Sequence, residues 1–333
     1  MARVTTAVIG TGGFGRGHIR RMLAQKRSTR IVGLVETSEK QREETQNVFV
    51  EAKAACPPYF DSIRAMVHAQ GVPDTVCICT PHSLHKQQII EALQAGIDVL
   101  IEKPMVLNAA EARAVIRARD RTGRVLSVAF PGSYSPAIRL AKKMIQAGEI
   151  GRVTAISAYC HQHWKARTTG TWRQDPAISG GGFLFDTGSH MVNTVVDLAD
   201  SAVSELNATL DTRGTPVEIL SAVSGRFASG AVFTLCAAGE SINCQSGVVV
   251  MGDAGVLLTG IWGETLQIIR AGRNEAERVA LAPWRGLWDH FLKVRAGRLP
   301  NPCPAECGLR FASLMDLVRQ SAASGTVARA KRR

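Results

Sequence analysis

The sequence is poor in aromatic residues and has no long uncharged apolar stretch. Aromatic side chains make up 5% of its 333 residues, which is too few for an evident platform on which nucleic-acid bases could stack. Nowhere does it approach the roughly 18 uncharged apolar residues that a membrane-spanning helix requires. We therefore expect a globular protein with neither a nucleic-acid nor a membrane partner.

The sequence also lacks the cysteine spacing of a disulfide framework. Its eight cysteines are scattered, and several lie in apolar runs, where a free thiol acts as a small hydrophobic side chain. Cys303 and Cys307 have a loosely metal-like spacing, but no second pair completes a four-ligand site. We expect free thiols and no metal. The chain runs from Met1 into the apolar segment 4–9 without room for a signal peptide, so we expect a cytoplasmic protein.

Acidic residues are fewer than basic ones: 28 Asp and Glu stand against 40 Lys and Arg, which gives a formal net charge of +12. Such a balance is compatible with nucleic-acid binding, with an anionic substrate or with solubility alone. The basic residues are spread along the chain, which favours the last two. The dense cluster at 331–333 belongs to a basic tail, residues 326–333, that we expect to be disordered.

Strand-like and helix-like segments alternate through the first domain, residues 1–130. This alternation predicts a parallel sheet with helices on both faces. The expected strands are 4–9, 31–35, 75–79, 99–101 and 125–129, and the expected helices are 14–26, 39–54, 84–95 and 109–121.

The pattern changes after residue 130 to closely spaced β-rich segments with glycine-rich turns. This indicates a second domain, residues 131–325, with a mostly antiparallel sheet, so the fold class is α/β. The expected strands are 153–160, 206–210, 220–227, 231–237, 247–251, 256–259 and 266–270, and the expected helices are 136–147, 287–296 and 305–321.

A glycine motif, Gly10-x-Gly12-x-x-Gly15, follows the first expected strand and opens a helix. In this setting the first glycine permits a tight turn, the second lets the backbone approach a pyrophosphate, and the third lets helix and strand pack closely. Gly13 and Phe14 lie between them, at a helix N-terminus that attracts anions. The motif predicts a bound dinucleotide.

An acidic residue, Glu36, ends the second expected strand, 21 residues beyond Gly15. A carboxylate at this place accepts hydrogen bonds from the adenosine ribose hydroxyls and repels a 2′-phosphate. NAD is therefore favoured over NADP, although Lys40 and Arg42 lie close by in the sequence.

Two more strand ends carry polar residues to the same edge of the predicted sheet. Thr80 and Pro81 begin a turn that leads to His85, and Glu102 and Lys103 follow the next strand. Ligands of open α/β sheets bind at the carboxyl ends of the strands. We expect these residues to contact the cofactor and Lys103 to lie near the nicotinamide.

A third glycine-rich stretch, Gly180–Gly182, precedes Asp186 and His190. If a helix follows the glycines, these two side chains stand four residues apart on one face. A carboxylate beside an imidazole orients the ring and raises its basicity. Alcohol oxidation needs such a base for the hydroxyl proton, and Lys103 could stabilise the developing alkoxide.

Taken together, four motifs resemble those of the glucose–fructose oxidoreductase, inositol dehydrogenase and MocA (Gfo/Idh/MocA) family. The combination is more specific than any single motif, and it runs from about residue 7 to the final helix. The motifs are Gly10–Gly15 with His18, Thr80-Pro81 with His85, Glu102-Lys103-Pro104, and Gly180–Gly182 with Asp186 and His190.

The resemblance implies an NAD(P)-binding Rossmann domain, a C-terminal α/β domain with a large open sheet, and a catalytic trio of Lys103, Asp186 and His190. It implies sugars, inositols or their derivatives as substrates, homodimers or homotetramers assembled through the sheet, and a cis bond before Pro104. The chain departs from the family pattern at His82, where Asn is usual, and at Asn193, where many members have Asp.

Candidates for substrate contacts in the second domain are His161, His163, Trp172, Arg173 and Asn193. His161 and His163 alternate on an expected strand and face one side of it. They could line a sugar pocket, or they could be ordinary residues of a polar face. A metal held by these two with Asp186 and His190 is the weakest reading, because hydride chemistry already uses the latter pair.

Three functions fit these features. The first is an NAD-dependent dehydrogenase acting on a secondary alcohol of a sugar, an inositol or a sugar derivative. The second is an NAD-dependent glycosidase that oxidises and re-reduces a sugar transiently. The third is a nicotinamide- or sugar-binding regulator without catalysis. Accumulation of reduced cofactor distinguishes the first from the other two.

Overall fold

The structure, a computed structural model, describes residues 3–330. The chain divides into two compact units. Unit 1 comprises residues up to Val106, Ala110–Ala129 and Gly286–Ala305, and unit 2 comprises Leu107–Ala109, Phe130–Arg285 and the residues from Glu306 onward.

Unit 1 is built on a six-stranded parallel sheet with the strand order β3-β2-β1-β4-β5-β6. This order is that of the Rossmann dinucleotide-binding fold. The central strands are uniformly apolar and buried, as expected for a sheet covered on both faces. The strands are β1 (Val4–Ile9), β2 (Thr29–Val35), β3 (Tyr59–Phe60), β4 (Thr75–Ile78), β5 (Asp98–Ile101) and β6 (Leu126–Val128).

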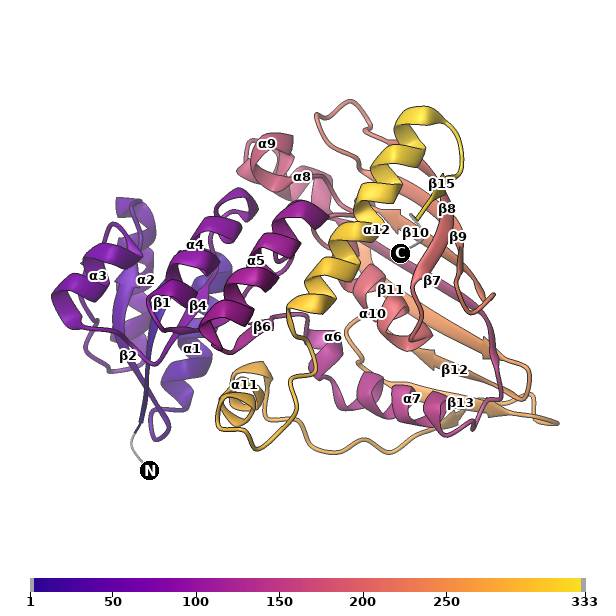
Figure 1. Ribbon diagram of the computed structural model, residues 1–333, viewed down its shortest axis with the longest axis horizontal. Coiled ribbons are helices and arrows are strands. Elements are labelled where there is room, and N and C mark those ends of the chain that lie inside the picture. Colours follow the sequence, from indigo (N-terminus) through magenta and orange to yellow (C-terminus); the bar gives the residue numbers. More distant parts are fainter. Residues whose placement is uncertain (1–2, 331–333) are drawn as a thin grey trace. The chain divides into compact units, whose positions relative to one another are not determined.

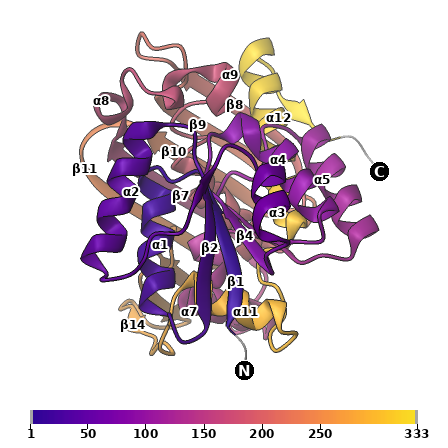
Figure 2. The same cartoon turned by 90° about the vertical axis from the view of Figure 1, so that its left-hand side faces the viewer.

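The helices of unit 1 cover both faces of this sheet. In Figure 2, α1 and α2 lie on one side of the central strands and α3, α4 and α5 on the other. Ser62 caps the N-terminus of α3, and Gly71 follows its C-terminus with a φ of 79°. The helices are α1 (Gly13–Ala24), α2 (Glu39–Glu51), α3 (Ile63–Gln70), α4 (His82–Gln94), α5 (Ala109–Thr122) and α11 (Leu287–Arg295).

The α11 segment joins unit 1 although it lies late in the sequence. Trp288 donates its indole N–H to Thr29 Oγ1 at 2.9 Å, and Arg295 donates to Asp98 at 2.9 Å and to Asp74 at 2.8 Å. The backbone N–H of Val128 donates to the Cys303 carbonyl. The expected division into residues 1–130 and 131–325 therefore differs from the observed units at this segment. A single boundary in the sequence cannot show that a later segment packs against the first domain.

Unit 2 is built on a nine-stranded sheet with the order β14-β13-β12-β11-β7-β10-β9-β8-β15. Only β7 and β10 pair in parallel, and the other pairings are antiparallel. The strands are β7 (Val153–His163), β8 (Val203–Asp211), β9 (Leu220–Phe227), β10 (Val232–Ala238), β11 (Glu240–Gly252), β12 (Gly255–Thr259), β13 (Leu266–Arg270), β14 (Glu277–Arg278) and β15 (Ala328–Arg329).

Helices cover one face of this sheet, and α10 is the most deeply buried of them (Figure 1). Along β10, buried and exposed residues alternate strictly, so one face is packed and the other is open. The remaining elements are α6 (Pro131–Tyr134), α7 (Pro136–Gln146), α8 (Trp164–Thr168), the 3₁₀ helix η1 (Trp172–Gln174), α9 (Pro176–Ser179), α10 (Gly188–Ala199) and α12 (Ala305–Ser324).

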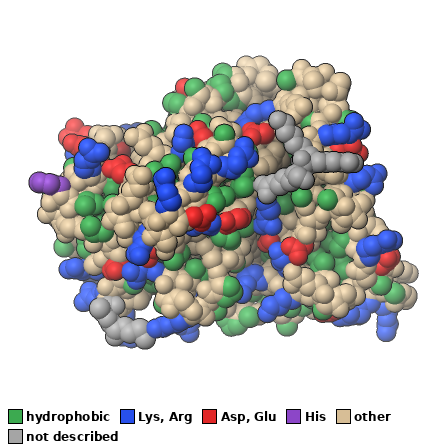
Figure 3. Space-filling model, viewed as in Figure 1, with side chains coloured by type: hydrophobic (Ala, Val, Ile, Leu, Met, Phe, Trp, Pro, Cys, Tyr) green, Lys and Arg blue, Asp and Glu red, His purple; other side chains and the backbone are tan. Residues whose placement is uncertain are grey.

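These features confirm the predicted fold class, a parallel Rossmann sheet and a second, mostly antiparallel sheet. All eight cysteines are free, as expected. Among the described helices, none has both the length and the apolar character needed to cross a bilayer. Figure 3 shows Lys and Arg side chains spread over the visible face among acidic and apolar ones.

The expectation of a disordered tail is wrong for residues 326–330. Residues Ala328–Arg329 form β15 and pair with β8, and Ala328 is 1% exposed. Arg329 also forms an ion pair with Glu205 at 3.1 Å. The edge of β8 supplies backbone partners that composition could not reveal. Residues 331–333 lie outside the described part of the chain.

Candidate functional site

The glycine loop between β1 and α1 has the geometry that the motif predicts. Gly10 adopts a φ of 82°, and a Cβ there would stand 2.8 Å from the Thr80 side chain. A Cβ at Gly15 would overlap the carbonyl oxygen of Gly10. By contrast, the space above Gly12 and Gly13 is open. The loop is therefore tight on its inner side and free on its outer side, which suits the close approach of a pyrophosphate.

Glu36 closes the loop from the end of β2. Its Oε2 accepts from the Thr11 N–H at 2.9 Å, and its Oε1 accepts from the N–H groups of Thr37 and Ser38 at 2.9 Å. The carboxylate is thus held beside the loop. The Arg42 guanidinium donates to the Glu36 carbonyl oxygen at 2.7 Å and pairs with Asp61 at 2.7 Å. The arrangement fits a ribose diol better than a 2′-phosphate.

The side chain of His85 helps to fix the turn after β4. The His85 Nε2 lies 2.8 Å from the Thr80 carbonyl oxygen, and its Nδ1 lies 2.9 Å from the Pro104 carbonyl oxygen. Burial lowers the pKa of His85 despite these two acceptors. The ring therefore ties the β4 turn, which begins α4 after Pro81, to the turn after β5. His82 lies beside it, with ring centroids 5.6 Å apart.

Glu102 and His18 form a buried pair below the glycine loop. The His18 Nε2 lies 2.7 Å from Glu102 Oε1. Burial alone would raise the pKa of Glu102, but the bond to His18 outweighs it and lowers the pKa to about 2. Burial alone would lower the pKa of His18, but the thiolate of Cys77 and the Glu102 carboxylate raise it to about 10. The pair is therefore an imidazolium and a carboxylate near neutral pH.

Lys103 lies beside the glycine loop within unit 1. Its ammonium group is 5.9 Å from the centroid of the Phe14 ring, and the residue is 7% exposed. Its backbone N–H donates to Glu102 Oε2 at 3.1 Å. The peptide bond between Lys103 and Pro104 is cis, as the family resemblance implied. Lysine side chains are rarely buried, so Lys103 differs from the ordinary solvated lysine that a strand end often carries.

In unit 2 the three glycines form a tight loop around the carboxylate of Glu218. Its oxygens accept from the N–H groups of Gly182 at 2.6 Å and Phe185 at 3.2 Å. Burial raises the pKa of Glu218 in spite of these bonds. A Cβ at Gly182 would overlap the Glu218 carbonyl oxygen, which explains why glycine stands there.

Asp186 lies in the turn before α10, not on the helix. The helix begins at Gly188, because the Gly188 N–H bonds to the Phe183 carbonyl in a turn that precedes it. The expectation that Asp186 and His190 share one helical face is therefore wrong in its geometry. The residues that follow Gly180–Gly182, up to Thr187, form a turn and are not part of the helix.

The Asp186 carboxylate is held by two donors of unit 2. Its Oδ2 accepts from Trp164 Nε1 at 2.9 Å and from Arg173 Nε at 3.2 Å. Asp186 is 6% exposed, and a buried carboxylate needs such donors. The Arg173 guanidinium in turn lies 4.5 Å from the centroid of the Trp172 ring. The structure thus brings Arg173, a predicted substrate residue, to Asp186, and places Trp172 against Arg173.

His190 is half-buried in the first turn of α10. It packs edge-on against Phe130, with ring centroids 5.9 Å apart, and against Trp262 at 5.7 Å. Asn193, one turn further, donates to Ser133 Oγ at 2.8 Å. It therefore links α10 to α6, and it is 5% exposed.

His161 and His163 lie on the other side of β7 from Asp186. The Gln162 side chain accepts from Thr187 Oγ1 at 3.1 Å, so it faces the loop that carries Asp186. The His161 Nδ1 lies 2.9 Å from Ser241 Oγ, and its ring stacks on that of Tyr159, which is 46% exposed. Strand alternation places both histidines on the open face of the sheet.

Sequence reasoning missed two residues that hold the site together, Trp164 and Glu218. Neither belongs to a motif, and both lie far from Asp186 along the chain. Trp164 lies four residues beyond the predicted strand 153–160, and it directly follows β7 only because the strand extends to His163. Glu218 carried no local signal, since it precedes β9 in an ordinary turn.

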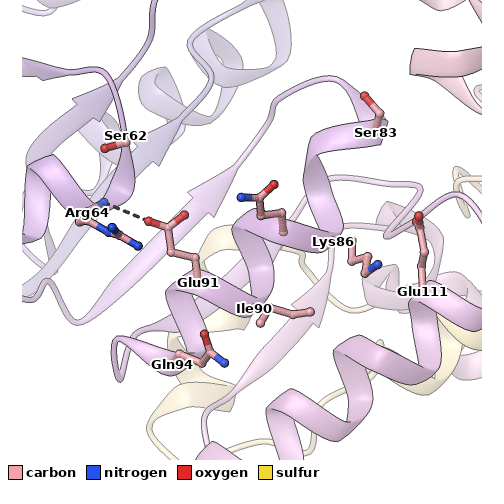
Figure 4. Close-up of a pocket in the computed structure, with 9 residues that line it drawn as sticks. Ser62, Arg64, Ser83, Lys86, Ile90, Glu91, Gln94 and Glu111 are labelled. Atoms are coloured by element: carbon pink, nitrogen blue, oxygen red, sulfur yellow. Dashed lines mark hydrogen bonds between the residues drawn. The ribbon is translucent and has the colours of Figure 1, made fainter.

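The surface of unit 1 also carries a shallow cavity of about 780 Å³, shown in Figure 4. Basic and acidic side chains line it together, and Glu91 accepts from the Arg64 backbone N–H at 3.1 Å. Neither the glycine loop nor Lys103 contributes to it. Its lining residues come from α3, α4, α5 and their flanks: Ser62, Arg64, Ser83, Lys86, Gln87, Ile90, Glu91, Gln94 and Glu111.

Comparison with known proteins places these features in a family. Residues 4–130 match the model of the oxidoreductase family with an NAD-binding Rossmann fold, and residues 138–258 match the GFO/IDH/MocA C-terminal domain. The fold and the loop thus define an oxidoreductase with an NAD-binding Rossmann domain. The chain belongs to the Gfo/Idh/MocA family, as the motifs predicted.

Relatives by sequence include inositol 2-dehydrogenase of Pseudomonas savastanoi, 27% identical over 96% of this chain and 94% of that protein. Levoglucosan dehydrogenase of Pseudarthrobacter phenanthrenivorans is 36% identical over 40% of this chain, but the match spans 34% of its own length. The match to 2,7-anhydro-N-acetylneuraminate hydratase of Mediterraneibacter gnavus is 26% identical, over 60% of this chain and 48% of that protein.

Solved structures share the fold along the whole chain. Levoglucosan dehydrogenase in complex with NADH superposes with a TM-score of 0.86 at 23% identity, covering all of both chains. Aldose-aldose oxidoreductase from Caulobacter crescentus gives a TM-score of 0.83 at 22% identity, covering 99% of this chain and 100% of that one.

Proposed function

We propose that the protein is an NAD-dependent dehydrogenase that moves a hydride between nicotinamide and a secondary alcohol of a sugar, an inositol or a sugar derivative. The observation that carries the proposal is the buried Lys103 beside Phe14 of the glycine loop. An ammonium group so placed is suited to the substrate oxygen. The names of the relatives, inositol and levoglucosan dehydrogenases, support the substrate class.

The cofactor would be held by unit 1. The open backbone at Gly12 and the N–H groups at the start of α1 would bind the pyrophosphate, and Glu36 would accept from the adenosine ribose. Thr80, His85 and Glu102 fix the turns that border the loop. When bound, NAD supplies the carbon that accepts the hydride.

The proton would be handled by the proposed catalytic trio. A ring nitrogen of His190 would take the hydroxyl proton, and Lys103 would donate a hydrogen bond to the same oxygen as negative charge develops on it. Asp186 would orient this base and stabilise it when protonated. Trp164 and Arg173 hold Asp186 in one position for that task.

Substrate contacts would come from unit 2. Arg173 bonds Asp186 and Trp172 packs against Arg173, so we propose that they border the sugar. Asn193 is bonded to Ser133, and we propose a supporting role for it. A sugar role for His161 and His163 has less support, because they occupy the open face of the sheet.

The test is a screen of the purified protein with NAD, and separately with NADP, against inositols, hexoses, anhydrosugars and uronates. Reduced nicotinamide should appear with at least one member, and NAD should be preferred. Lys103→Met and His190→Ala should each lower kcat/KM by about 100- to 1,000-fold, whereas the exposed Lys26→Met serves as the matched control. NADH binding without turnover across the panel would instead favour a regulator.

A second candidate is a reaction without net oxidation, as in a glycosidase that works by transient oxidation. The relative named 2,7-anhydro-N-acetylneuraminate hydratase supports this second candidate, because a hydratase reaction involves no net oxidation or reduction. In this case sugar product should form while reduced nicotinamide does not accumulate. Chromatography of the sugars beside the absorbance assay separates the two candidates.

We also propose that the protein assembles as a homodimer or homotetramer through the open face of the unit 2 sheet. This face carries the exposed apolar side chains of Tyr159 at 46% and Val232 at 41% exposure, and Ile242, in the irregular stretch of the neighbouring strand β11, is 97% exposed. Light scattering should give a mass above one chain, and Ile242→Asp should shift it downward. A monomeric parent protein would contradict this assembly.

A further inference from the structure

Two thiols and an imidazole meet beneath the glycine loop, and the proposed hydride chemistry uses none of them. The Sγ atoms of Cys77 and Cys79 lie 3.6 Å apart. Together with a ring nitrogen of His18, these ligand atoms all lie within 4.8 Å of one another. Cys77 is fully buried and His18 is 4% exposed, whereas Cys79 is partly accessible.

The secondary structure explains this convergence. Residues 77 and 79 are two apart on an extended segment, so their side chains point to the same face. That face packs against α1, where His18 follows Gly15 by three residues and lies on the same side of the helix. The Cβ of Cys79 is 3.6 Å from the place where a Cβ at Gly15 would stand.

The separation of the two sulfur atoms suits a tetrahedral metal ion. Zinc bonds to thiolate sulfur at about 2.3 Å and to imidazole nitrogen at about 2.0 Å, which sets two sulfur ligands about 3.8 Å apart. The observed separation is 3.6 Å. The sulfur atoms therefore need almost no movement to share one ion.

The second ring nitrogen of His18 completes the pattern. Its Nε2 is bonded to Glu102 Oε1 at 2.7 Å, while its Nδ1 is buried, has no oxygen or nitrogen partner within the described chain and interacts with the Cys77 thiol. A metal-binding imidazole commonly bonds a carboxylate with its other nitrogen, which fixes the ring. Nδ1 is thus the nitrogen left for the thiols and an ion.

We propose that His18, Cys77 and Cys79 form a binding site for one thiophilic divalent metal ion of the zinc class. Two thiolates and one imidazole supply three ligands once the ion has displaced the remaining thiol proton and the Nδ1 proton of the His18 imidazolium, and Glu102 orients the ring. The fourth position belongs to a water molecule on the Cys79 side, where the site is partly accessible. Soft thiolate ligands favour zinc, cadmium or cobalt over magnesium or calcium.

The site is coupled to the cofactor loop through Cys79. The Cys79 N–H donates to the Ile9 carbonyl at 2.7 Å, and a Cβ at Gly10 would stand 2.9 Å from the Cys79 carbonyl carbon. An ion bound to the Cys79 sulfur restrains the segment that supports the loop, so the loop adjusts less readily to a pyrophosphate. Metal binding therefore weakens NADH binding, and by linkage NADH weakens metal binding. This coupling rests on the assigned cofactor, whereas the metal site itself does not.

The first experiment titrates Co²⁺ into reduced protein that carries Cys236→Ser and Cys244→Ser, which remove the exposed thiols. One Co²⁺ per chain should bind with a thiolate-to-cobalt absorption band, and Zn²⁺ should displace it. Cys79→Ser and His18→Gln should each weaken binding at least tenfold, whereas Cys303→Ser, a buried thiol elsewhere in unit 1, should not. Circular dichroism verifies that each variant is folded. Absence of the band, or a band unchanged in folded Cys79→Ser, would overturn the site.

The second experiment follows NADH fluorescence with and without saturating Zn²⁺. The NADH dissociation constant should rise about tenfold with zinc in the same thiol-reduced background, and it should not change in the Cys79→Ser variant. Stoichiometric metal binding with an unchanged NADH affinity would overturn the coupling but confirm the site. Failure to bind NADH at all in the absence of metal would instead count against the proposed function.

Discussion

The Asp186 carboxylate accepts a hydrogen bond from the indole N–H of Trp164 at 2.9 Å. This bond joins the first residue of α8 to the turn before α10, so the proposed catalytic carboxylate is fixed from a different part of the sequence. The Trp164 ring also packs against Phe183 at 6.0 Å, which keeps the indole in place. Trp164 is therefore a positioning residue for Asp186.

Trp164→Phe keeps an aromatic ring against Phe183 but removes the donor to Asp186. We expect kcat to fall about tenfold to a hundredfold, since a hydrogen bond to a charged group is worth about 1.5–3 kcal/mol. Trp288→Phe is the matched control, because it removes an indole bond to Thr29 in unit 1. Both variants should lose stability alike in urea unfolding. Equal kcat values for the two would contradict the role of Trp164.

Substitutions at different glycines of the Gly10–Gly15 loop should affect folding and cofactor binding separately. Gly15→Ala should unfold the loop or the domain, because the added Cβ meets the Gly10 carbonyl oxygen. Gly12→Ala should leave the melting temperature nearly unchanged, because the space there is open. The same variant should weaken NADH binding at least tenfold, since the methyl group occupies the approach of the pyrophosphate. Fluorescence titration of folded Gly12→Ala tests this, and unchanged affinity would count against the loop as the phosphate site.

Glu36 should determine the choice between NAD and NADP. Glu36→Gln keeps an oxygen for the Thr11 N–H but removes the charge that repels a 2′-phosphate. We expect the ratio of kcat/KM for NAD over NADP to fall at least tenfold. Glu39→Gln, three residues further in the exposed start of α2, is the matched control. If both variants keep the parent's ratio, cofactor choice lies elsewhere.

Most of the architecture followed from residue patterns. The strands β1, β9 and β13 begin and end where the hydrophobic runs do, because buried strands in this fold are bounded by turn residues on both sides. The family was recognisable because its motifs lie at strand ends, where chemistry and backbone geometry constrain the same residues. The cis bond before Pro104 followed from that recognition.

What the sequence could not show depends on contacts distant along the chain. Asp186 does not lie on α10, because a glycine turn closed around Glu218, 32 residues later, delays the helix to Gly188. The tail residues 328–329 are ordered only because β8 offers an edge. Return of α11 to unit 1 depends on Arg295 reaching two aspartates of the parallel sheet. Local periodicity carries no information on such pairings.

The pH dependence of stability at Asp74 tests whether this residue helps to hold α11 against unit 1. Burial alone would raise its pKa, but hydrogen bonds from Thr5 and the guanidinium of Arg295 outweigh it and hold the pKa below its usual value. A carboxyl whose pKa is lower in the folded state stabilises the fold above the pKa of the unfolded chain, near 3.9. This contribution is lost as the pH falls through the lower folded value.

The free energy of unfolding should therefore decline as the pH falls from about 5 toward 2, and Asp74→Asn should flatten part of that decline. At neutral pH the same variant should be less stable by about 1 kcal/mol, because Asn accepts weaker hydrogen bonds from Thr5 and Arg295. Urea unfolding followed by circular dichroism at several pH values measures both effects. Asp61→Asn, which removes a carboxylate with 82% side-chain exposure, is the matched control. An acid profile for Asp74→Asn that coincides with the parent's would show that Asp74 does not hold α11 to the sheet through its charge.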